Sequence, residues 1–355
     1  MILINASVVS LKHRGMGGFT KNILKVLLLN NDVKFLVVSC TDIDLEIKEI
    51  IQKQNIKYIQ INTPLPLFEQ IIIPFIIVFY KIKVCWFPSN TFPLWKPSMT
   101  KYIVTIHDLI FLDKNLKPKN LYQKVGKLYR ALNTKWGVKK IDSLTSVSRT
   151  MLEDITSKFN IKGDTSVLYN SIDINQEFNE GILRRYDLQD EKFIYTIAGI
   201  APHKNLKFLI KSFKHFRLKF SDFRLVITGV DRKYHHLFVD DNIILTDFIS
   251  DGEKNSLIKK AEMFVFASKQ EGFGIPLIEA MYLNQRVLAS DIKIFSEIGN
   301  GFVNYFSLND GDFLYNLFGS SGVVKNNIDE VRCYIEKKFN TEESANKLLS
   351  IILTI

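Results

Sequence analysis

The stretch MFVFASKQEGFGIPLIEAM, residues 263–281, joins a buried-strand pattern to a glycine-rich loop and the start of a helix. MFVFA is a continuous apolar run of strand length, typical of a parallel strand covered on both faces. Pro276 suits the start of a helix because its φ is already fixed near the helical value. The amide N–H groups at a helix start attract anions, and the carboxylates of Glu271 and Glu279 can accept hydrogen bonds from a diol. The stretch therefore predicts a loop that holds both phosphate and hydroxyl groups, as found in a nucleotide sugar.

Apolar runs of strand length alternate with helical patterns along the whole chain. The expected strands are 2–9, 34–39, 57–61, 84–87, 102–106, 143–147, 193–197, 224–228, 242–245, 263–267 and 286–289. The expected helices include 19–29, 121–136, 205–220, 252–261 and 276–283. This alternation is typical of parallel sheets covered by helices on both faces. It predicts an α/β fold with two doubly wound, Rossmann-like domains that bind ligands at the carboxyl ends of their strands.

The polar stretch 170–191 divides the two series and is interpreted as a linker. The expected domains are therefore an acceptor-side domain over 1–172 and a nucleotide-sugar-binding domain over 190–338. A C-terminal helix over 339–355 is expected to pack back toward the first domain.

The charge of the chain is concentrated in its first half. The net charge is +10, and residues 1–175 carry 24 basic and 13 acidic side chains, which predicts an anionic partner for that half. The three cysteines are scattered, so the sequence favours a reducing compartment and indicates neither a disulfide framework nor a zinc site. The most apolar window, 71–80, is half the length needed to cross a bilayer, and we expect no transmembrane helix.

EGFGIPLIEAM, residues 271–281, resembles the E-x7-E signature of retaining glycosyltransferases of the GT-B fold, known as family 4 or glycosyl transferases group 1. The resemblance implies two Rossmann-like domains that face a central cleft. It also implies that Glu279 binds the ribose diol and that Glu271 faces the transferred sugar. Three loop residues are expected to assist with their backbone amides: Gly272, Phe273 and Gly274.

Further stretches resemble the same family. Lys204, in IAGIAPHKNLKFLI (197–210), resembles the lysine that neutralises the donor pyrophosphate, where a cation would stabilise the leaving group. The second basic residue that the family often has a few positions earlier is missing, since the chain reads Ala-Gly-Ile over 198–200. His107 follows a strand and is expected to contact the sugar or the acceptor.

Two backbone contacts with the donor are expected as well. GMGGFTKNIL (15–24) resembles the family's first loop, so Gly17 and Gly18 are expected near the donor phosphate. The loop at Phe248 is expected to contact the nucleotide base.

Two Asp-x-Asp pairs raise the alternative of a metal-dependent transferase. Asp42 and Asp44 lie at a polar helix start, and Asp310 and Asp312 lie in a late loop. Chance or capping explains both pairs, since Asp is favoured at helix starts. With Lys204 and the loop amides at the pyrophosphate, we expect no metal and no cofactor other than the donor substrate.

Residues 117–140 carry eight basic and no acidic side chains, with apolar residues at helical spacing. The pattern predicts an amphipathic helix whose apolar stripe packs into the first domain. Its charge would allow docking on an anionic membrane surface.

These patterns predict a retaining, metal-independent glycosyltransferase. It would move a hexose, with mannose the first choice, from a GDP- or UDP-sugar to a glycan acceptor that is lipid-linked, in the synthesis of a surface polysaccharide such as O-antigen, lipopolysaccharide or capsule. The expected location is cytoplasmic, peripheral on the inner face of the cell membrane. A nucleotide-sugar epimerase, a phosphorylase, or a basic protein that binds membranes or nucleic acid without catalysis are the alternatives. No nucleic-acid partner is expected, because basic and aromatic residues interleave only in 117–140.

Overall fold

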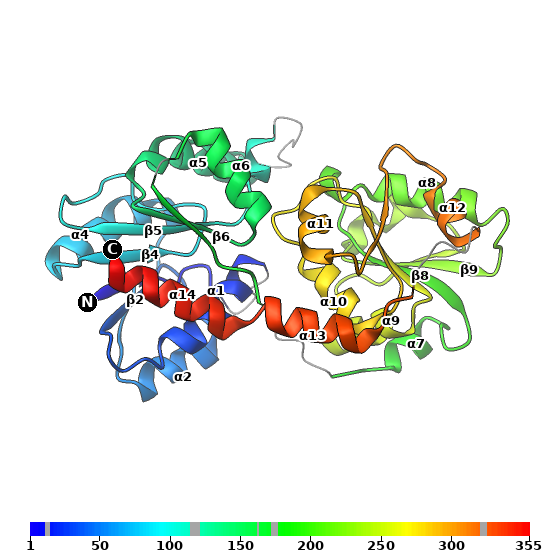
Figure 1. The fold of residues 1–355 in the computed structure, drawn as a ribbon, viewed down its shortest axis with the longest axis horizontal. Coiled ribbons are helices and arrows are strands. Elements are labelled where there is room, and N and C mark those ends of the chain that lie inside the picture. The colour runs from blue at the N-terminus through cyan, green and yellow to red at the C-terminus, as the bar shows by residue number, and fades with distance from the viewer. Residues whose placement is uncertain (11–14, 114–120, 162, 172–176, 320–324) are drawn as a thin grey trace. The chain divides into compact units, whose positions relative to one another are not determined.

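The computed structural model describes residues 1–355 apart from 11–14, 114–120, 162, 172–176 and 320–324. The chain divides into two compact units (Figure 1). The first unit comprises Met1–Ser171 together with Phe339–Ile355, and the second comprises Ile172–Lys338. The C-terminal segment therefore belongs to the same unit as the N-terminus.

The first unit contains a seven-stranded parallel sheet in the order β3-β2-β1-β4-β5-β6-β7. Its strands are β1 Ile2–Asn5, β2 Phe35–Ser39, β3 Lys57–Gln60, β4 Val84–Phe87, β5 Lys101–Ile106, β6 Ser143–Ser146 and β7 Asp164–Val167. Strands β1, β2 and β6 are buried along their whole length, and Ile4 of β1 lies opposite Val37 on one side and Trp86 on the other. The strand order reverses between β1 and β4, which is where doubly wound sheets bind ligands.

The helices of the first unit cover the two faces of this sheet (Figure 1). They are α1 Met16–Leu27, α2 Leu45–Lys53, α3 Leu65–Leu67, the π-helical turn η1 Phe68–Ile72, α4 Ile73–Phe79, α5 Leu121–Gly137, α6 Arg149–Phe159 and α14 Thr341–Thr354. Side-chain caps set several starts: Asp44 accepts from the Glu46 amide at α2, and Ser148 accepts from the Met151 amide at α6. The last helix, α14, packs against α1.

The second unit contains a six-stranded parallel sheet in the order β10-β9-β8-β11-β12-β13. Its strands are β8 Lys192–Ile197, β9 Phe223–Thr228, β10 Ile243–Leu245, β11 Met263–Phe266, β12 Val287–Ser290 and β13 Asn304–Phe306. Its helices are α7 Gly181–Arg185, α8 Leu206–Phe216, α9 Asp251–Lys260, α10 Ile275–Leu283, α11 Lys293–Gly299, α12 Phe313–Gly319 and α13 Ile328–Lys338. Here the order reverses between β8 and β11, so the loops after these two strands meet.

The two doubly wound units confirm the predicted fold class, with three local corrections. The first strand was expected to reach residue 9 but ends at Asn5, whose side chain accepts hydrogen bonds from the amide and the hydroxyl of Ser7 and turns the chain. The linker expected over 170–191 includes α7, and Ile182 and Leu188 are fully buried. Residues 172–176 of that stretch lie outside the described residues. Strands β7 and β13 were not predicted.

The apolar stripe of α5 does not pack into the core, contrary to the prediction from its spacing. Four of its residues are more than half exposed: Leu121, Val125, Leu128 and Trp136. The buried face instead uses Asn133 and Thr134, and the Asn133 amide both donates to and accepts from the backbone of Phe92. Small and polar residues fill this face because it lies against a loop backbone that needs hydrogen-bond partners. Residues 117–120 of the predicted helix lie outside the described part of the chain.

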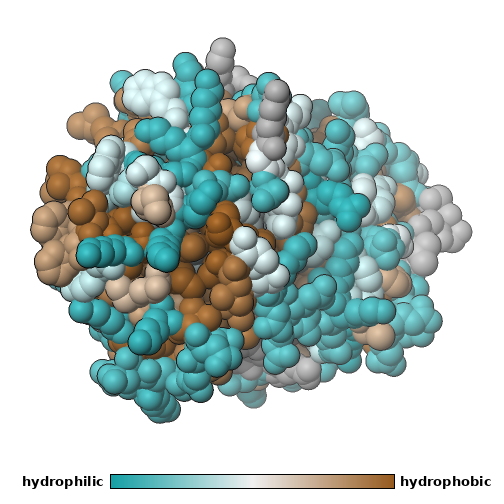
Figure 2. Space-filling model, turned by 60° about the vertical axis from the view of Figure 1, so that its left-hand side comes forward, coloured by the Kyte–Doolittle hydropathy of each residue, from teal (hydrophilic) through white to brown (hydrophobic). Residues whose placement is uncertain are grey.

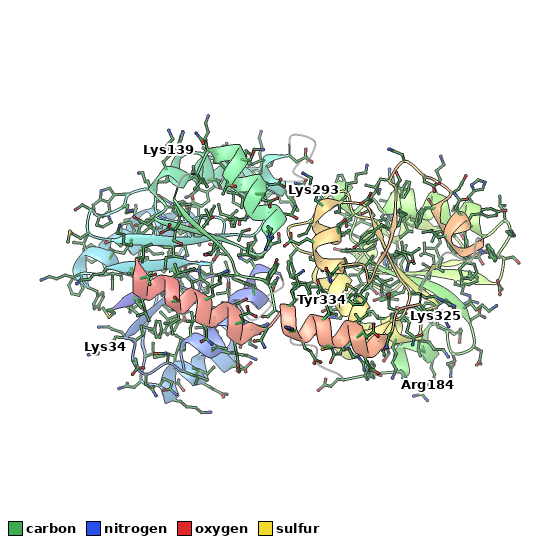
Figure 3. The ribbon with its side chains drawn as sticks, in the orientation of Figure 1. Lys34, Lys139, Arg184, Lys293, Lys325 and Tyr334 are labelled. Carbon is green, nitrogen blue, oxygen red and sulfur yellow. The ribbon has the colours of Figure 1, made fainter. Side chains whose placement is uncertain are left out.

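The surface of the first unit is apolar in places and hydrophilic around them. Figure 2, in which the left-hand side of Figure 1 comes forward, shows a broad gathering of hydrophobic side chains with hydrophilic ones around it. Lys139, just beyond α5, projects outward from the same unit (Figure 3). Over the described residues, no helix combines the length and the apolar character needed to span a bilayer.

Candidate active site

Two of the predicted site residues meet at the carboxyl edge of the second sheet. Lys204 ends a 3-10 turn after β8, and Glu271 follows β11, the neighbouring strand at the reversal point. The Lys204 ammonium lies 2.5 Å from Glu271 Oε1, and the Ser268 hydroxyl donates to the same oxygen at 2.7 Å. The Lys204 and Glu271 side chains remain partly exposed, at 24% and 11%. This charge-assisted pair is therefore accessible to a ligand at the edge of the sheet.

The signature loop connects Glu271 to helix α10 through a residue that must be glycine. Gly274 has a φ of +115° and forms the N-cap of α10, and a Cβ built on it would lie 3.1 Å from the Phe295 ring. Phe273 is buried and anchors the loop, while Gly272 is half-buried. Pro276 lies in the first turn of the helix, as the sequence predicts. The loop therefore has a fixed conformation that leads directly to the helix N-terminus.

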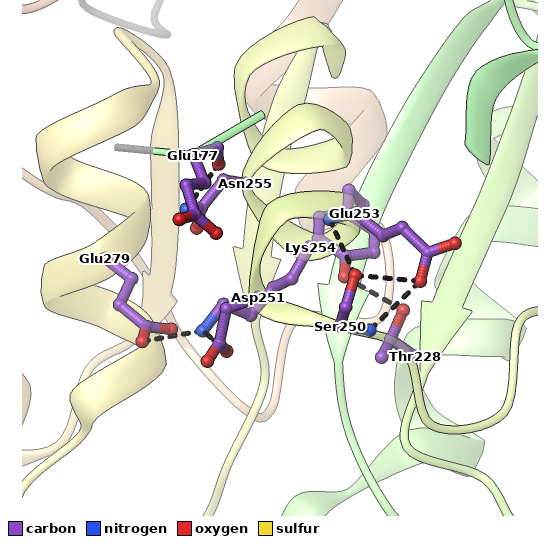
Figure 4. Close-up of polar contacts among 9 residues, drawn as sticks. Glu177, Thr228, Ser250, Asp251, Glu253, Lys254, Asn255 and Glu279 are labelled. Atoms are coloured by element: carbon purple, nitrogen blue, oxygen red, sulfur yellow. Dashed lines mark hydrogen bonds and ion pairs between the residues drawn. The ribbon is translucent and has the colours of Figure 1, made fainter. Parts of the chain in front are cut away.

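Glu279 lies one turn into α10 and pairs with a lysine that the sequence analysis did not identify. Lys254 Nζ lies 2.9 Å from Glu279 Oε1 and 2.8 Å from Asp251 Oδ1 (Figure 4). Burial raises the pKa of Glu279, and the charge and hydrogen bond of Lys254 oppose this shift. Burial also lowers the pKa of Lys254, but Glu279 and Asp251 outweigh it and raise that pKa overall. Lys254 therefore stabilises Glu279 in its ionised form.

Helix α9 positions Lys254 through a network at its own N-terminus. Ser250 and Glu253 form a capping box (Figure 4). Glu253 also pairs with Arg185 at 2.8 Å. Asn255 donates to the carbonyl oxygen of Glu177 at 3.2 Å, which ties the helix to the segment before α7. These contacts fix the helix from which Lys254 reaches Glu279.

The loops after β9 and β10 continue the same edge. The Gly229 amide donates to the Asp247 carbonyl at 2.8 Å, and Phe248 beside it is 57% exposed. Below them, the hydroxyls of Thr228 and Thr246 lie 2.7 Å apart in the buried sheet. The exposed Phe248 ring and its backbone thus lie at the carboxyl edge of the second sheet, where Lys204 also lies.

In the first unit, His107 follows β5 and is almost completely buried. Its Nε2 lies 2.9 Å from the Pro88 carbonyl oxygen, which can only accept, so Nε2 carries the hydrogen and Nδ1 is left as an acceptor. Burial lowers the pKa of His107 to about 4, against the hydrogen bond to Pro88. The Asn90 side chain accepts from the His107 amide at 2.8 Å and fixes the backbone here. His107 is therefore a neutral hydrogen-bonding residue at physiological pH.

The start of α1 lies beside His107. The rings of Phe19 and His107 meet edge to face with centroids 5.0 Å apart. Gly17 and Gly18 are in the first turn of this helix, and a Cβ on Gly18 would meet nothing within 4 Å. Open space thus lies next to the backbone at position 18, and packing within the first unit does not require a glycine there.

The Asp-x-Asp pairs have structural partners. Asp44 caps α2 and lies 3.0 Å from Lys21, and Asp42 pairs with Lys48. Asp310 accepts from the Asp312 amide at 2.9 Å. In the described ranges, His, Cys, Asp and Glu side chains do not gather in threes that could hold a metal ion.

Comparisons with known proteins agree with this geometry. Residues 181–309 match the model of the family described as "Glycosyl transferases group 1". The O-antigen chain mannosyltransferase RfbU of Salmonella typhimurium is 28% identical over 211 residues, which cover 57% of this chain and 55% of that protein. The serotype-specific mannosyltransferase WbdA of Escherichia coli is 25% identical over 178 residues, covering 45% and 22%. The chain thus spans about half the length of RfbU and less of WbdA.

Solved structures match over the whole length. WaaG, a glycosyltransferase involved in lipopolysaccharide biosynthesis, aligns with a TM-score of 0.69 at 12% identity and covers 100% of both chains. A glycosyltransferase from Rickettsia africae aligns with a TM-score of 0.66 at 16% identity, covering 99% of this chain and 98% of that one. These likenesses and the two parallel-sheet units define a protein of the GT-B fold. The second unit of the chain carries the match to the group 1 glycosyltransferases, and the curated proteins that the chain resembles include mannosyltransferases.

Proposed function

We propose that this protein is a retaining, metal-independent glycosyltransferase that moves a hexose, with mannose the first candidate, from a nucleotide-diphosphate sugar to a glycan acceptor. The contact between Lys204 and Glu271 at the reversal point of the second sheet carries the proposal. It combines a cation for a leaving diphosphate with a carboxylate for sugar hydroxyls at one accessible edge. The names of RfbU and WbdA favour mannose and a role in O-antigen synthesis.

The second unit would bind the donor through three groups. Glu279, kept ionised by Lys254, would accept hydrogen bonds from the ribose diol. The N-terminus of α10 and Lys204 would hold the diphosphate, since helix amides and an ammonium both stabilise negative charge. Glu271 would exchange its contact with Lys204 for hydroxyls of the sugar.

In the proposed reaction, the bond between the anomeric carbon and the phosphate oxygen breaks and a bond to an acceptor oxygen forms on the same face. The acceptor hydroxyl gives its proton to the departing phosphate, and Lys204 stabilises the charge that develops on the diphosphate. The first unit would bind the acceptor, with His107 Nδ1 as a neutral hydrogen-bond acceptor for a hydroxyl. Solved neighbours such as Alr3699/HepE of Anabaena, in complex with UDP and glucose, support a nucleotide-sugar donor.

The acceptor is proposed to be a lipid-linked glycan, which brings the protein to the inner face of the cell membrane. The basic side chains of α5 would then face anionic lipid headgroups.

Thermal unfolding in the presence of nucleotides tests the donor site. GDP, UDP and their sugars are added with and without magnesium to the wild type, to Glu279→Ala and to Glu330→Ala, an exposed glutamate on α13 that serves as the control. We expect one nucleotide to raise the Tm without magnesium in the wild type and in Glu330→Ala, but not in Glu279→Ala. If no nucleotide or nucleotide sugar raises the Tm, the proposal is wrong.

A further inference from the structure

The turn η1 and helix α4 present an apolar stripe to solvent. Ile71, Phe75, Val78 and Phe79 recur at helical spacing and are exposed by 60%, 70%, 55% and 67%. The rings of Phe75 and Phe79 stack with centroids 6.2 Å apart, so they form one continuous surface. Figure 2 shows the hydrophobic side chains that gather on this side of the first unit. Contiguous exposed apolar surface of this kind usually marks an interaction site.

The fold does not require this stripe to be apolar. The opposite face of the same segment already supplies the core with Phe68, Ile73, Ile76 and Ile77, all of them buried. A surface helix normally has polar residues on its outer face, and a helix that is apolar all round is normally covered. The outer face of α4 therefore has the composition of a covered surface.

Two tryptophans extend this surface beyond α4. The Gln70 side chain accepts from the Leu94 amide at 2.9 Å, which places η1 beside a loop whose next residue, Trp95, is 55% exposed. From the same loop, Lys96 donates to the Lys140 carbonyl at 3.0 Å, next to the end of α5. Trp136 at that end is 57% exposed. Exposed tryptophans beside an apolar stripe are typical of the boundary between headgroups and acyl chains.

The surrounding charge is basic, although Asp142 pairs with Lys96 and Lys101. Residues 50–107 contain six lysines and a single acidic residue, Glu69, which is fully buried. Lys81 and Lys83 are exposed directly after α4, and Lys57 lies 4.2 Å from the centre of the Tyr80 ring at the same end. Exposed lysines around an apolar stripe match an anionic lipid surface, on which long basic side chains reach the headgroups.

We propose that the stripe of η1 and α4 docks the first unit on an anionic lipid bilayer. Ile71, Phe75, Val78 and Phe79 enter the boundary between headgroups and acyl chains, with Trp95 and Trp136 at the interface. The inference rests on the membrane association within the proposed function and deepens it, because it adds an apolar contact from α4 to the charge of α5. A second copy of this chain fits the surface poorly, since a two-fold contact would bring lysines against lysines.

Vesicle flotation tests this docking. The wild type is mixed with vesicles of phosphatidylglycerol and phosphatidylcholine in equal amounts, or with phosphatidylcholine alone, in buffers of low and moderate salt. We expect binding to the mixed vesicles, weakened but not abolished by salt, and a loss of at least tenfold in Phe75→Ser/Phe79→Ser. Leu218→Ser, which changes an 82% exposed leucine of the second unit, is the matched control and is expected to bind like the wild type.

Native fluorescence gives a second readout. The chain has three tryptophans, and Trp86 is fully buried while Trp95 and Trp136 lie on the proposed surface. Phosphatidylcholine with brominated acyl chains, mixed with phosphatidylglycerol, is expected to quench the wild type and to leave the double variant unquenched.

Three results would overturn the proposal: equal binding by the wild type and the double variant, no binding to anionic vesicles, or a dimer in sedimentation that only the double variant dissociates. The last would assign the stripe to self-association. Thermal unfolding with nucleotides, measured on the same variants without lipid, separates this outcome from failure of the donor site. The double variant is expected to keep the nucleotide response of the wild type.

Discussion

Lys254 and Glu279 form an ion pair that joins α9 to α10, with both side chains more than four-fifths shielded from solvent. A shielded carboxylate next to an ammonium ionises more readily than one without that partner. The pair thus makes the charge of the proposed ribose contact depend on Lys254, a residue of α9 that lies outside the signature loop.

Replacing Lys254 should make nucleotide binding sensitive to pH. In Lys254→Met, burial would raise the pKa of Glu279 further, so a protonated carboxyl that binds a diol less well would accumulate as the pH falls. We expect the affinity for the preferred nucleotide to fall on the order of tenfold at pH 6 and less at pH 8, since one pKa unit corresponds to a factor of ten. Titration calorimetry at the two pH values measures this.

Lys260→Met, on the exposed end of the same helix, is the control and should bind nucleotide like the wild type at both pH values. An equal loss at pH 6 and pH 8 in Lys254→Met would assign Lys254 a purely structural role.

Replacing Lys204 should separate recognition of the diphosphate from recognition of the nucleoside. Lys204→Met removes the ammonium beside Glu271, and we expect transfer to fall by about 10²–10³, the usual cost of losing one group that stabilises the leaving charge. Binding of the free nucleoside should not change. The rate of donor consumption and the affinities for nucleoside and nucleotide measure the two effects. Lys207→Met, an exposed residue on α8, should behave like the wild type.

Adding a methyl group at Gly274 should destabilise the second unit. Gly274→Ala places a Cβ at a φ of +115° and 3.1 Å from the Phe295 ring, and strain of this kind costs about 2 kcal/mol. Urea unfolding of the variant should show a correspondingly lower free energy of unfolding. Gly311→Ala, where an added Cβ meets nothing within 4 Å, should change it by less than about 0.5 kcal/mol. Equal stabilities of the two variants would contradict the strained geometry.

The buried Glu69 should make the stability of the first unit depend on pH. Burial raises the pKa of Glu69 to about 7, although the Tyr129 and Thr91 hydroxyls donate to it. Between about pH 4.5 and 7 the folded state keeps a proton that the unfolded state has released. The contribution of Glu69 to the free energy of unfolding is therefore fully present below about pH 4.5 and is lost as the pH rises through about 7. The loss amounts to about 3 kcal/mol.

Glu69→Gln, which cannot ionise, should therefore gain stability relative to the wild type as the pH rises from 5 to 8. Chemical unfolding at both pH values measures the difference. His107 contributes in the opposite direction, since burial lowers its pKa to about 4, but both proteins share that contribution. A constant difference across this range would show that Glu69 is ionised throughout.

The sequence predicted those features that depend on local order along the chain. Glu271 and Lys204 each follow a strand, and the alternation of strands and helices was enough to expect them at one sheet edge. Lys254 was missed because its partner lies 25 residues further on, and no local pattern marks a contact between two helices. The spacing of apolar residues in α5 predicted an apolar face but not that this face is exposed. The buried side of the helix is made of Asn133 and other small or polar residues.

Helix α14 gives the chain an unusual order of assembly. Ala345, Leu348 and Ile352 are buried in the first unit, and the Ser344 hydroxyl donates to the Tyr169 carbonyl at 3.0 Å. During synthesis, the sheet of the second unit leaves the ribosome complete while the first unit still lacks the helix that covers α1. The middle of the chain can therefore finish folding before its beginning. The surface of α1 that α14 covers stays exposed until α14 has been synthesised.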